Sequence, residues 1–210
     1  MIKIENLSKS FGRKKVFEKV NLEFTKGDLV HFFGPNGSGK STLFKIIVDI
    51  LSPDEGKVIV EKGKRIGASI ENPGFIENET ILYNLKYLYS LLNEYNEEVE
   101  NQLNELCKNF NLDLYSKEKM KNYSVGMRQK VAIIQAIMED QDIILLDEPT
   151  RGLDQDGIEQ FYSLINNYQK QKNKVIMIAS HDLMDKLPYT KKLIIKDYKI
   201  YEENNTKKHN

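Results

Sequence analysis

Apolar and polar residues alternate along two segments near the start of the chain, residues 1–7 and 19–24. Alternation with a period of two is typical of β-strands that have one exposed face. The pattern therefore predicts that an antiparallel pair of strands opens the domain. Residues 28–34 then form a short, mostly apolar run that predicts a strand, and residues 38–51 have the apolar spacing of a helix.

The apolar spacing changes in the middle of the chain. Residues 56–61 and 65–70 have strand character, whereas apolar residues from 79 to 112 recur every three or four positions, as on one face of a helix. We therefore expect a helical insert over this second stretch. The apolar residues that carry the pattern are Leu82, Leu85, Leu88, Leu91, Leu92, Val99, Leu103, Leu106 and Phe110.

Strands and helices alternate again in the second part of the chain. This alternation predicts an α/β fold in which a mostly parallel sheet is flanked by helices. One domain is expected over residues 1–200, with an N-terminal antiparallel β subdomain and an α-helical subdomain inserted at about 75–138, and a polar tail follows over 201–210. The elements expected here are a helix from Ser124 to about Met138, a buried strand within 142–149, an amphipathic helix over 155–171, a buried strand over 174–180 and a hairpin over 191–201.

Charge and composition limit the partners of the chain. The 210 residues include 31 basic and 31 acidic side chains, so bulk charge gives no support for nucleic-acid binding. No segment approaches the roughly 18 uninterrupted apolar residues of a membrane-spanning helix, so the chain itself is not expected to lie in a membrane. Cys107 is the single cysteine, and we expect a half-buried thiol in a reducing compartment, the cytoplasm.

Residues 34–42, between the first buried strand and the first helix, read GPNGSGKST. They match the G-x-x-x-x-G-K-[ST] pattern of a phosphate-binding loop, in the strand–loop–helix setting that its mechanism requires. Bare backbone amides at the N-terminus of a helix attract phosphate, Lys40 can reach the β- and γ-phosphates of ATP, and the Ser41 hydroxyl can join the Mg²⁺ shell. The sequence thus predicts a P-loop NTPase core. The expected nucleotide-binding residues of the loop are Gly34, Pro35, Asn36, Gly37, Ser38, Gly39, Lys40, Ser41 and Thr42.

Two adjacent acids follow the apolar run at 143–146. Asp147 is expected to orient Mg²⁺ through its water shell, and Glu148 to polarise a water molecule beside the γ-phosphate. Such a pair is also an ordinary way for a strand to end, but a phosphate-binding loop in the same chain favours catalysis. His181 follows the next apolar strand, where it can contact the γ-phosphate, hold the water and the base in register, or act only as a polar cap. The expected catalytic residues are Lys40, Glu148 and His181.

A second helix N-terminus is marked by the segment NYSVGMRQKVAIIQAIM at 122–138. Ser124 is a good helix N-cap and Gly126 leaves the helix N-terminus bare, so this turn offers a second anion site. The P-loop, this Ser-x-Gly-Met-x-Gln helix, the Asp-Glu strand, RGLD at 151–154 and SHD at 180–182 occur in this order. Together they resemble the nucleotide-binding subunit of ABC transporters over about residues 2–200.

The resemblance implies an ABC ATPase that forms a head-to-tail dimer with a second copy of itself or with a homologous ATPase. Each ATP would lie between the P-loop of one subunit and Ser124, Gly126 and Met127 of the other. Asp154 would face the partner across the interface. Phe11 occupies the place where the family stacks an aromatic ring on adenine, although it could instead be a core residue of the first sheet. The dimer would act at the cytoplasmic face of the membrane and drive integral membrane permease subunits.

Two departures from the family pattern are informative. The signature reads Tyr-Ser-Val-Gly-Met rather than Leu-Ser-Gly-Gly-Gln, but its phosphate-facing serine and second glycine remain. Glu71 stands where the family usually has a metal-contacting glutamine, as in exporters of bacitracin and lantibiotics. An anionic side chain can ligate Mg²⁺ tightly but would repel an unshielded γ-phosphate. Glu71 is therefore an expected metal ligand and favours export, while a plain surface acid is the alternative.

Two other functions remain open from the sequence. A soluble ABC-type ATPase acting on ribosomes or DNA would have the same core, but members of those classes usually carry two cores in one chain or a long coiled coil. The neutral charge argues in the same direction. A P-loop module that binds without catalysis would be expected to lack Glu148 or His181, and both are present.

Overall fold

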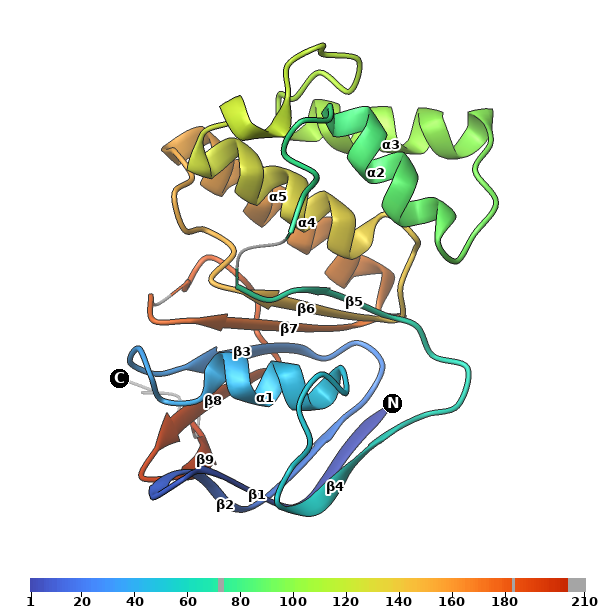
Figure 1. Cartoon of the computed structure of the whole chain (residues 1–210). Coiled ribbons are helices and arrows are strands. Elements are labelled where there is room, and N and C mark those ends of the chain that lie inside the picture. The colour runs from blue at the N-terminus through green and yellow to red at the C-terminus, as the bar shows by residue number, and fades with distance from the viewer. Residues whose placement is uncertain (72–73, 183, 204–210) are drawn as a thin grey trace.

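The computed structural model of the chain describes residues 1–71, 74–182 and 184–203. Two sheets organise these residues (Figure 1). One is a three-stranded antiparallel sheet with the order β2-β1-β4, and the other is a six-stranded sheet with the order β5-β6-β7-β3-β8-β9. The strands are β1 (Ile2–Phe11), β2 (Lys14–Phe24), β3 (Leu29–Phe33), β4 (Glu55–Val60), β5 (Ile66–Ser69), β6 (Ile143–Asp147), β7 (Val175–Ser180), β8 (Lys191–Lys196) and β9 (Lys199–Glu202).

The six-stranded sheet is parallel except at one edge. Strands β5, β6, β7, β3 and β8 run parallel to one another, and β9 pairs antiparallel with β8 as the predicted closing hairpin. The predicted α/β fold with a mostly parallel sheet and an N-terminal antiparallel sheet is confirmed. The strand expected over residues 56–61 is β4, which spans Glu55–Val60 and joins the antiparallel sheet by pairing with β1.

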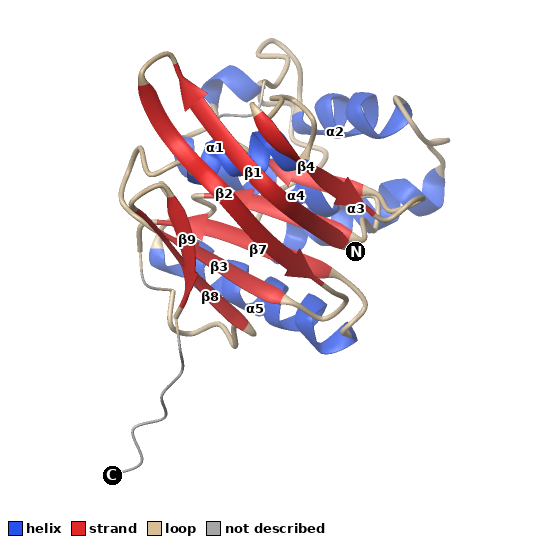
Figure 2. Cartoon of the chain, turned by 90° about the horizontal axis from the view of Figure 1, so that it is seen from below, coloured by secondary structure: helices blue, strands red, loops and turns tan. Residues whose placement is uncertain are grey.

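Helices cover both faces of the parallel sheet. They are α1 (Lys40–Ile47), α2 (Ile81–Ser90), α3 (Glu97–Asn109), α4 (Val125–Ile137) and α5 (Gln155–Gln171), with a short 3₁₀ helix at Met120–Asn122. Helix α1 packs between the two sheets, α4 and α5 cover the opposite face of the parallel sheet, and α2 and α3 pack against α4 (Figure 1). Figure 2 views the molecule from the side of the antiparallel sheet, which lies across the parallel one.

The hydrophobic core consists of two clusters, one on each face of the parallel sheet. Successive residues of β6 point to opposite clusters: Ile144 belongs to the cluster under α4 and α5, and Leu145 to the cluster around α1. All five residues of β6 and all six of β7 are buried. Because a parallel strand covered on both faces must be apolar throughout, the continuous apolar runs in the sequence correspond to the central strands.

Three expectations from the sequence need correction. The helix predicted to reach residue 51 ends at Ile47, since Asp49 has the left-handed backbone conformation (φ 60°) that ends a helical run. Leu91 and Leu92 were expected on the buried face of the helical insert, but they follow the end of α2 and are exposed. The domain was expected to end at residue 200, but strand β9 continues to Glu202, because its backbone pairs with β8 that far. Residues 204–210 of the predicted tail lie outside the described residues.

The single cysteine is more deeply buried than expected. Cys107 on α3 is fully inside the cluster formed by the helical insert and α4, rather than half-buried. Burial raises the pKa of its thiol to about 12 because the thiolate would lose its hydration. In the part of the chain that the structure describes, no helix combines the length and the apolar character needed to cross a bilayer.

Candidate functional site

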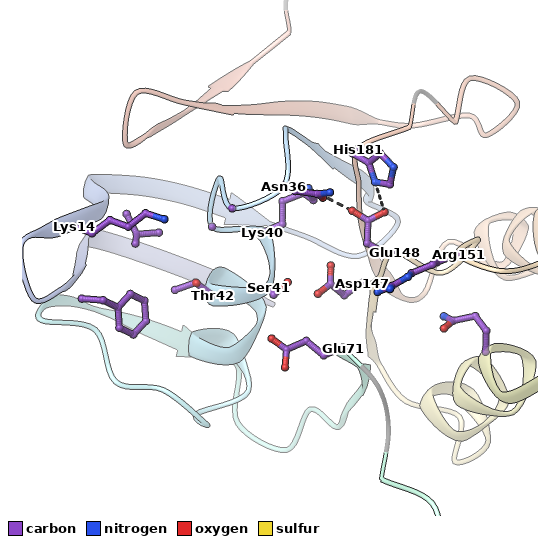
Figure 3. Close-up of a pocket in the computed structure, with 15 residues that line it drawn as sticks. Lys14, Asn36, Lys40, Ser41, Thr42, Glu71, Asp147, Glu148, Arg151 and His181 are labelled. Atoms are coloured by element: carbon purple, nitrogen blue, oxygen red, sulfur yellow. Dashed lines mark hydrogen bonds and ion pairs between the residues drawn. The ribbon is translucent and has the colours of Figure 1, made fainter. Parts of the chain in front are cut away.

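A cavity of about 720 Å³ opens at the carboxyl ends of β3, β6 and β7 (Figure 3). Strand β3 leads into the P-loop, β6 into Glu148 and β7 into His181. Because β6, β7 and β3 are parallel neighbours in the sheet, these three segments meet at one edge, where open α/β sheets bind ligands. The described residues that line the cavity are Phe11, Lys14, Val16, Asn36, Gly37, Gly39, Lys40, Ser41, Thr42, Glu71, Gln129, Asp147, Glu148, Arg151 and His181.

The P-loop wraps tightly around the start of α1. Gly39 has φ 109°, and a Cβ added there would lie 2.6 Å from Cγ1 of Val16, so only glycine fits between the loop and β2. Lys40 is the first residue of α1 and is buried, with Nζ donating to the backbone oxygen of Gly34 at 2.7 Å and to that of Pro35 at 3.3 Å. Ser41 and Thr42 follow on the same helix turn and line the cavity. The loop therefore presents a lysine and hydroxyl groups at a helix N-terminus, as phosphate binding requires.

Asp147 and Glu148 lie at the end of β6 in different environments. Asp147 is 6% exposed, and burial raises the pKa of its carboxyl group because the charged form would lose its hydration. Glu148 has φ 47°, and its backbone N–H donates to the oxygen of Ala179 on β7 at 2.8 Å. Non-glycine residues seldom adopt a left-handed backbone, and Glu148 in this conformation lines the cavity.

Glu148 is held between two nitrogen groups (Figure 3). Its Oε1 lies 3.4 Å from Nζ of Lys40, an ion pair without hydrogen-bond geometry, and its Oε2 accepts from Nδ1 of His181 at 2.8 Å. Because a carboxylate oxygen can only accept, the proton of this bond belongs to Nδ1 of His181. Glu148 thus contacts both of the other residues expected to be catalytic, Lys40 and His181.

Oxygen groups suited to a magnesium ion line the same cavity. Within the described ranges, Oδ1 of Asp147 is buried and has no hydrogen-bond partner, and Ser41 lies beside this carboxylate. A buried carboxylate oxygen without a partner is costly, so a ligand for it is physically reasonable. Hard oxygen groups are the ligands that Mg²⁺ takes, and it usually binds one or two protein groups together with phosphates. Asp147 and Ser41 therefore fit Mg²⁺.

Glu71 lines the cavity from the segment after β5. Its carboxylate is exposed and pairs with Nζ of Lys45 on α1, with 2.6 Å between Nζ and Oε1. Its backbone is left-handed, with φ 57°. Glu71 therefore lies at the cavity, as its assignment as a metal ligand requires, but its carboxylate contacts a lysine.

Phe11 lies at the rim of the cavity, at the end of β1. Half of its surface is exposed, and Nζ of Lys9 lies 5.4 Å from the centre of its ring. A residue of the sheet core would be buried, so the alternative role as a core residue is wrong. The exposed ring is available to stack on a flat ligand.

The first turn of the signature helix α4 is outside the described lining of this cavity. Ser124 caps the helix, its Oγ accepting from the N–H of Met127 at 3.2 Å. Gly126 was expected to leave the helix N-terminus bare, but it also permits close packing: an added Cβ would lie 2.4 Å from the backbone oxygen of Gly152. Among the described residues that line the cavity, Ser124, Gly126 and Met127 are absent.

Asp154 is exposed and caps α5. Its Oδ1 accepts from the N–H of Gly157 at 2.9 Å, and Nζ of Lys130 on α4 lies 3.9 Å away. The acid therefore has a local role in starting α5, and its exposed carboxylate lies near the signature helix. Like the three signature residues, it does not line the cavity within the described part of the chain.

Four residues that line the cavity were not expected from the sequence: Lys14, Val16, Gln129 and Arg151. Arg151 lies within the RGLD segment, three residues after Glu148, and its guanidinium points toward Asp147 (Figure 3). The sequence signal that could have identified Arg151 as a cavity residue was its position only three residues after Glu148. Gln129 lies on α4, and its position at the cavity depends on how α4 packs, which no local pattern shows.

Comparisons with known proteins agree with this geometry. The family model described as "ABC transporter" matches residues 17–151. The lantibiotic transport ATP-binding protein SrtF of Streptococcus pyogenes is 33% identical over 88% of this chain and 82% of that protein. The bacitracin transport ATP-binding protein BcrA of Bacillus licheniformis is 30% identical over 88% of this chain, which spans 63% of its length.

A solved structure is similar over nearly the whole chain. The ATP-binding cassette MJ0796 was solved as a dimer and also in a post-hydrolysis state with ADP and Pi. In both cases the similarity covers 97% of this chain and 98% of the MJ0796 chain. The identity is 27% for the first structure and 26% for the second, and the TM-score is 0.85 for both. These findings confirm the family that the ordered motifs indicated. The chain belongs to the ABC transporter family and is one of its ATP-binding ATPase cassettes.

Proposed function

We propose that the chain hydrolyses ATP as one subunit of a head-to-tail dimer, and that this dimer drives separate integral membrane subunits. One observation carries the proposal: Ser124, Gly126 and Met127 lie on an exposed helix N-terminus that is not part of the cavity containing Lys40 and Glu148. A second copy or a homologous ATPase, placed head to tail, would bring its signature helix over the open side of this cavity. The similar cassette MJ0796 was solved as a dimer, which supports a dimer of this chain.

The residues of the cavity suit hydrolysis without a covalent intermediate. Lys40 would neutralise the phosphates, and Phe11 would stack on adenine. Asp147 and Ser41 would hold Mg²⁺, which supplies further positive charge on the phosphates when bound, and Glu71 is a proposed additional ligand. Glu148 would take a proton from the attacking water, and His181 would hold Glu148 in place through its Nδ1–H. Asp154 would face the partner subunit.

The proposed cargo is a peptide antibiotic or a similar amphipathic compound that is exported. Two relatives are named for lantibiotic and bacitracin transport. Glu71, which replaces the glutamine usual in the family, is the residue by which this chain resembles such exporters. The chain would then act at the cytoplasmic face of the membrane, bound to its permease subunits. The formal net charge of zero gives no support for a nucleic-acid partner.

The first test concerns the dimer. The Glu148→Gln variant, which keeps the shape of the side chain but removes the base, is mixed with ATP and Mg²⁺ and its mass is measured by light scattering. We expect a mass twice that of the monomer with ATP, and the monomer mass with ADP. Adding Ser124→Arg in the same chain should abolish the dimer while leaving ATP binding intact. A dimer that forms equally well with Ser124→Arg would contradict the head-to-tail arrangement.

The second test concerns the partners. The tagged chain is purified from detergent-solubilised membranes of its own host, and the proteins that accompany it are identified. A polytopic membrane protein in stoichiometric amount is the expected result. Co-sedimentation with ribosomes or DNA instead, with no membrane protein, would support a soluble ATPase and contradict the transporter assignment.

A further inference from the structure

His31 is a buried histidine in the middle of β3, the strand that leads into the P-loop. It is 1% exposed and lies in an otherwise apolar strand. Its ring stacks on Tyr189, with 4.8 Å between ring centres and an angle of 16° between the planes. Its Nε2 lies 2.8 Å from Oγ of Ser180, the last residue of β7. A buried polar group needs a partner, and Ser180 is the partner of this one.

The direction of this hydrogen bond follows from the other bond of Ser180. The Ser180 hydroxyl donates to the backbone oxygen of Asp182 at 2.7 Å. A hydroxyl has one proton and a carbonyl has none, so the Nε2–H of His31 must be the donor to Ser180. Burial, assisted by the nearby charge of Lys192, lowers the pKa of His31 to about 4, so its ring is neutral at physiological pH and the proton on Nε2 is its only N–H.

The two bonds hold the backbone on both sides of His181. Ser180 precedes His181 and Asp182 follows it, so the hydroxyl of Ser180 closes a tight loop around it. The Asp182 carboxylate lies 3.7 Å from Nε2 of His181, and Nδ1 of His181 donates to Glu148 (Figure 3). Main-chain bonds between β3 and β7 fix the strands themselves, whereas the loop beyond Ser180 depends on such side-chain contacts.

We propose that His31 is a positioning residue for ATP hydrolysis: by donating to Ser180 it holds the loop on which His181 meets Glu148. The inference rests on the role proposed for His181 above. His31 is not among the described residues that line the cavity, so it acts through Ser180 and does not touch the nucleotide. Because β3 continues directly into the P-loop at Gly34, His31 also joins the phosphate-binding strand to the loop of His181.

Three single variants separate positioning from packing. His31→Phe keeps a ring against Tyr189 but removes the N–H donor, whereas His31→Gln keeps an N–H at about the position of Nε2. Tyr189→Phe is the matched control, because its hydroxyl has no hydrogen-bond partner among the described residues and its ring is retained. We expect kcat of His31→Phe to fall about 10-fold, with KM for ATP within about 2-fold, as for loss of a group that acts on the transition state. His31→Gln should recover most of the rate, and Tyr189→Phe should match the wild type.

Double variants decide whether the effect passes through Ser180 and His181. Ser180→Ala should lower kcat as His31→Phe does, and combining the two should lower it no further. In a His181→Ala background, His31→Phe should have no additional effect. Equal losses from His31→Phe in both backgrounds, or full activity of His31→Phe, would overturn this inference alone. A His181→Ala chain that hydrolyses ATP at the wild-type rate would overturn the role proposed for His181, and the inference with it.

Folding is checked on the same samples. The melting temperature of each variant is measured by circular dichroism, and kcat is compared well below the lowest of these temperatures. If His31→Phe does not fold, Ser180→Ala alone carries the test, since it removes the same link with a much smaller change. Wild-type activity of a folded Ser180→Ala chain would then overturn the inference.

Discussion

Oε2 of Glu148 accepts a hydrogen bond of 2.8 Å from Nδ1 of His181, although 33 residues separate the two in the chain. The bond joins the ends of β6 and β7, which are neighbours in the parallel sheet. A further link between these segments is the bond from the N–H of Glu148 to the oxygen of Ala179. The carboxylate is thus fixed by contacts to the next strand rather than by its own turn alone.

Glu148→Gln tests the carboxylate as a base. The amide keeps the size of the side chain but cannot take a proton from water, so kcat should fall by about 10²-fold or more. The affinity for ATP should stay within about 2-fold, measured by titration with a fluorescent ATP analogue. Asp156→Asn, at an exposed acid in the first turn of α5, is the control and should hydrolyse ATP normally. Equal rates in the two variants would rule out Glu148 as the base.

Gly126→Ala tests the packing of the signature helix against Gly152. The new Cβ would lie 2.4 Å from a backbone oxygen, so the two segments must move apart, at a cost of about 1–3 kcal/mol in the free energy of unfolding. Urea denaturation measures this cost. Gly74→Ala is the control, because an added Cβ there meets no atom of the described residues within 4 Å beyond its chain neighbours, and its effect should be under about 0.5 kcal/mol. A stable Gly126→Ala chain would show that this contact gives way easily.

Asp142→Asn tests an ion pair at the start of β6. Hydrogen bonding from Lys64, at 2.8 Å, lowers the pKa of Asp142, and the N–H of Arg65 donates to the same carboxylate. A carboxyl group with a lowered folded-state pKa stabilises the fold above its unfolded pKa, and the contribution is lost as pH falls through the folded value. Solvent screening keeps it small, about 0.5 kcal/mol. The difference between variant and wild type in urea denaturation should therefore be present at pH 7 and absent at pH 2; a difference that persists at pH 2 would exclude this origin.

Glu71→Gln tests the residue that replaces the usual glutamine. Its ion pair with Lys45 is exposed, so its loss should change the free energy of unfolding by less than about 1 kcal/mol, and ATP binding should be kept. We expect altered coupling: in vesicles that contain the membrane subunits, the ratio of substrate transported to ATP hydrolysed should change. Lys45→Met, which removes only the partner, is the companion variant. Identical transport and turnover in wild type and Glu71→Gln would contradict a role for this carboxylate in coupling.

Local patterns were sufficient for most of the elements. The apolar runs at 143–146 and 175–179 predicted buried strands because a strand covered on both faces has no position open to water. Ser124 predicted a helix start because its hydroxyl satisfies a free N–H, and the structure has that bond. Leu91 and Leu92 were misplaced, since periodicity shows which face is apolar but not where the helix ends.

The sequence by itself determined the chemistry of this protein: a glycine-rich loop with its lysine, two acids after an apolar strand and a histidine after another one, in the order of an ABC ATPase. These signals lie within short segments, where residue type and spacing suffice. Only the tertiary structure decided which side chains share the cavity, because the neighbour of each strand is set by the order β6-β7-β3 in the sheet and not by sequence distance. For that reason Arg151 and Gln129 join the cavity, and the contact of His31 with Ser180, 149 residues away, becomes visible only in the folded chain.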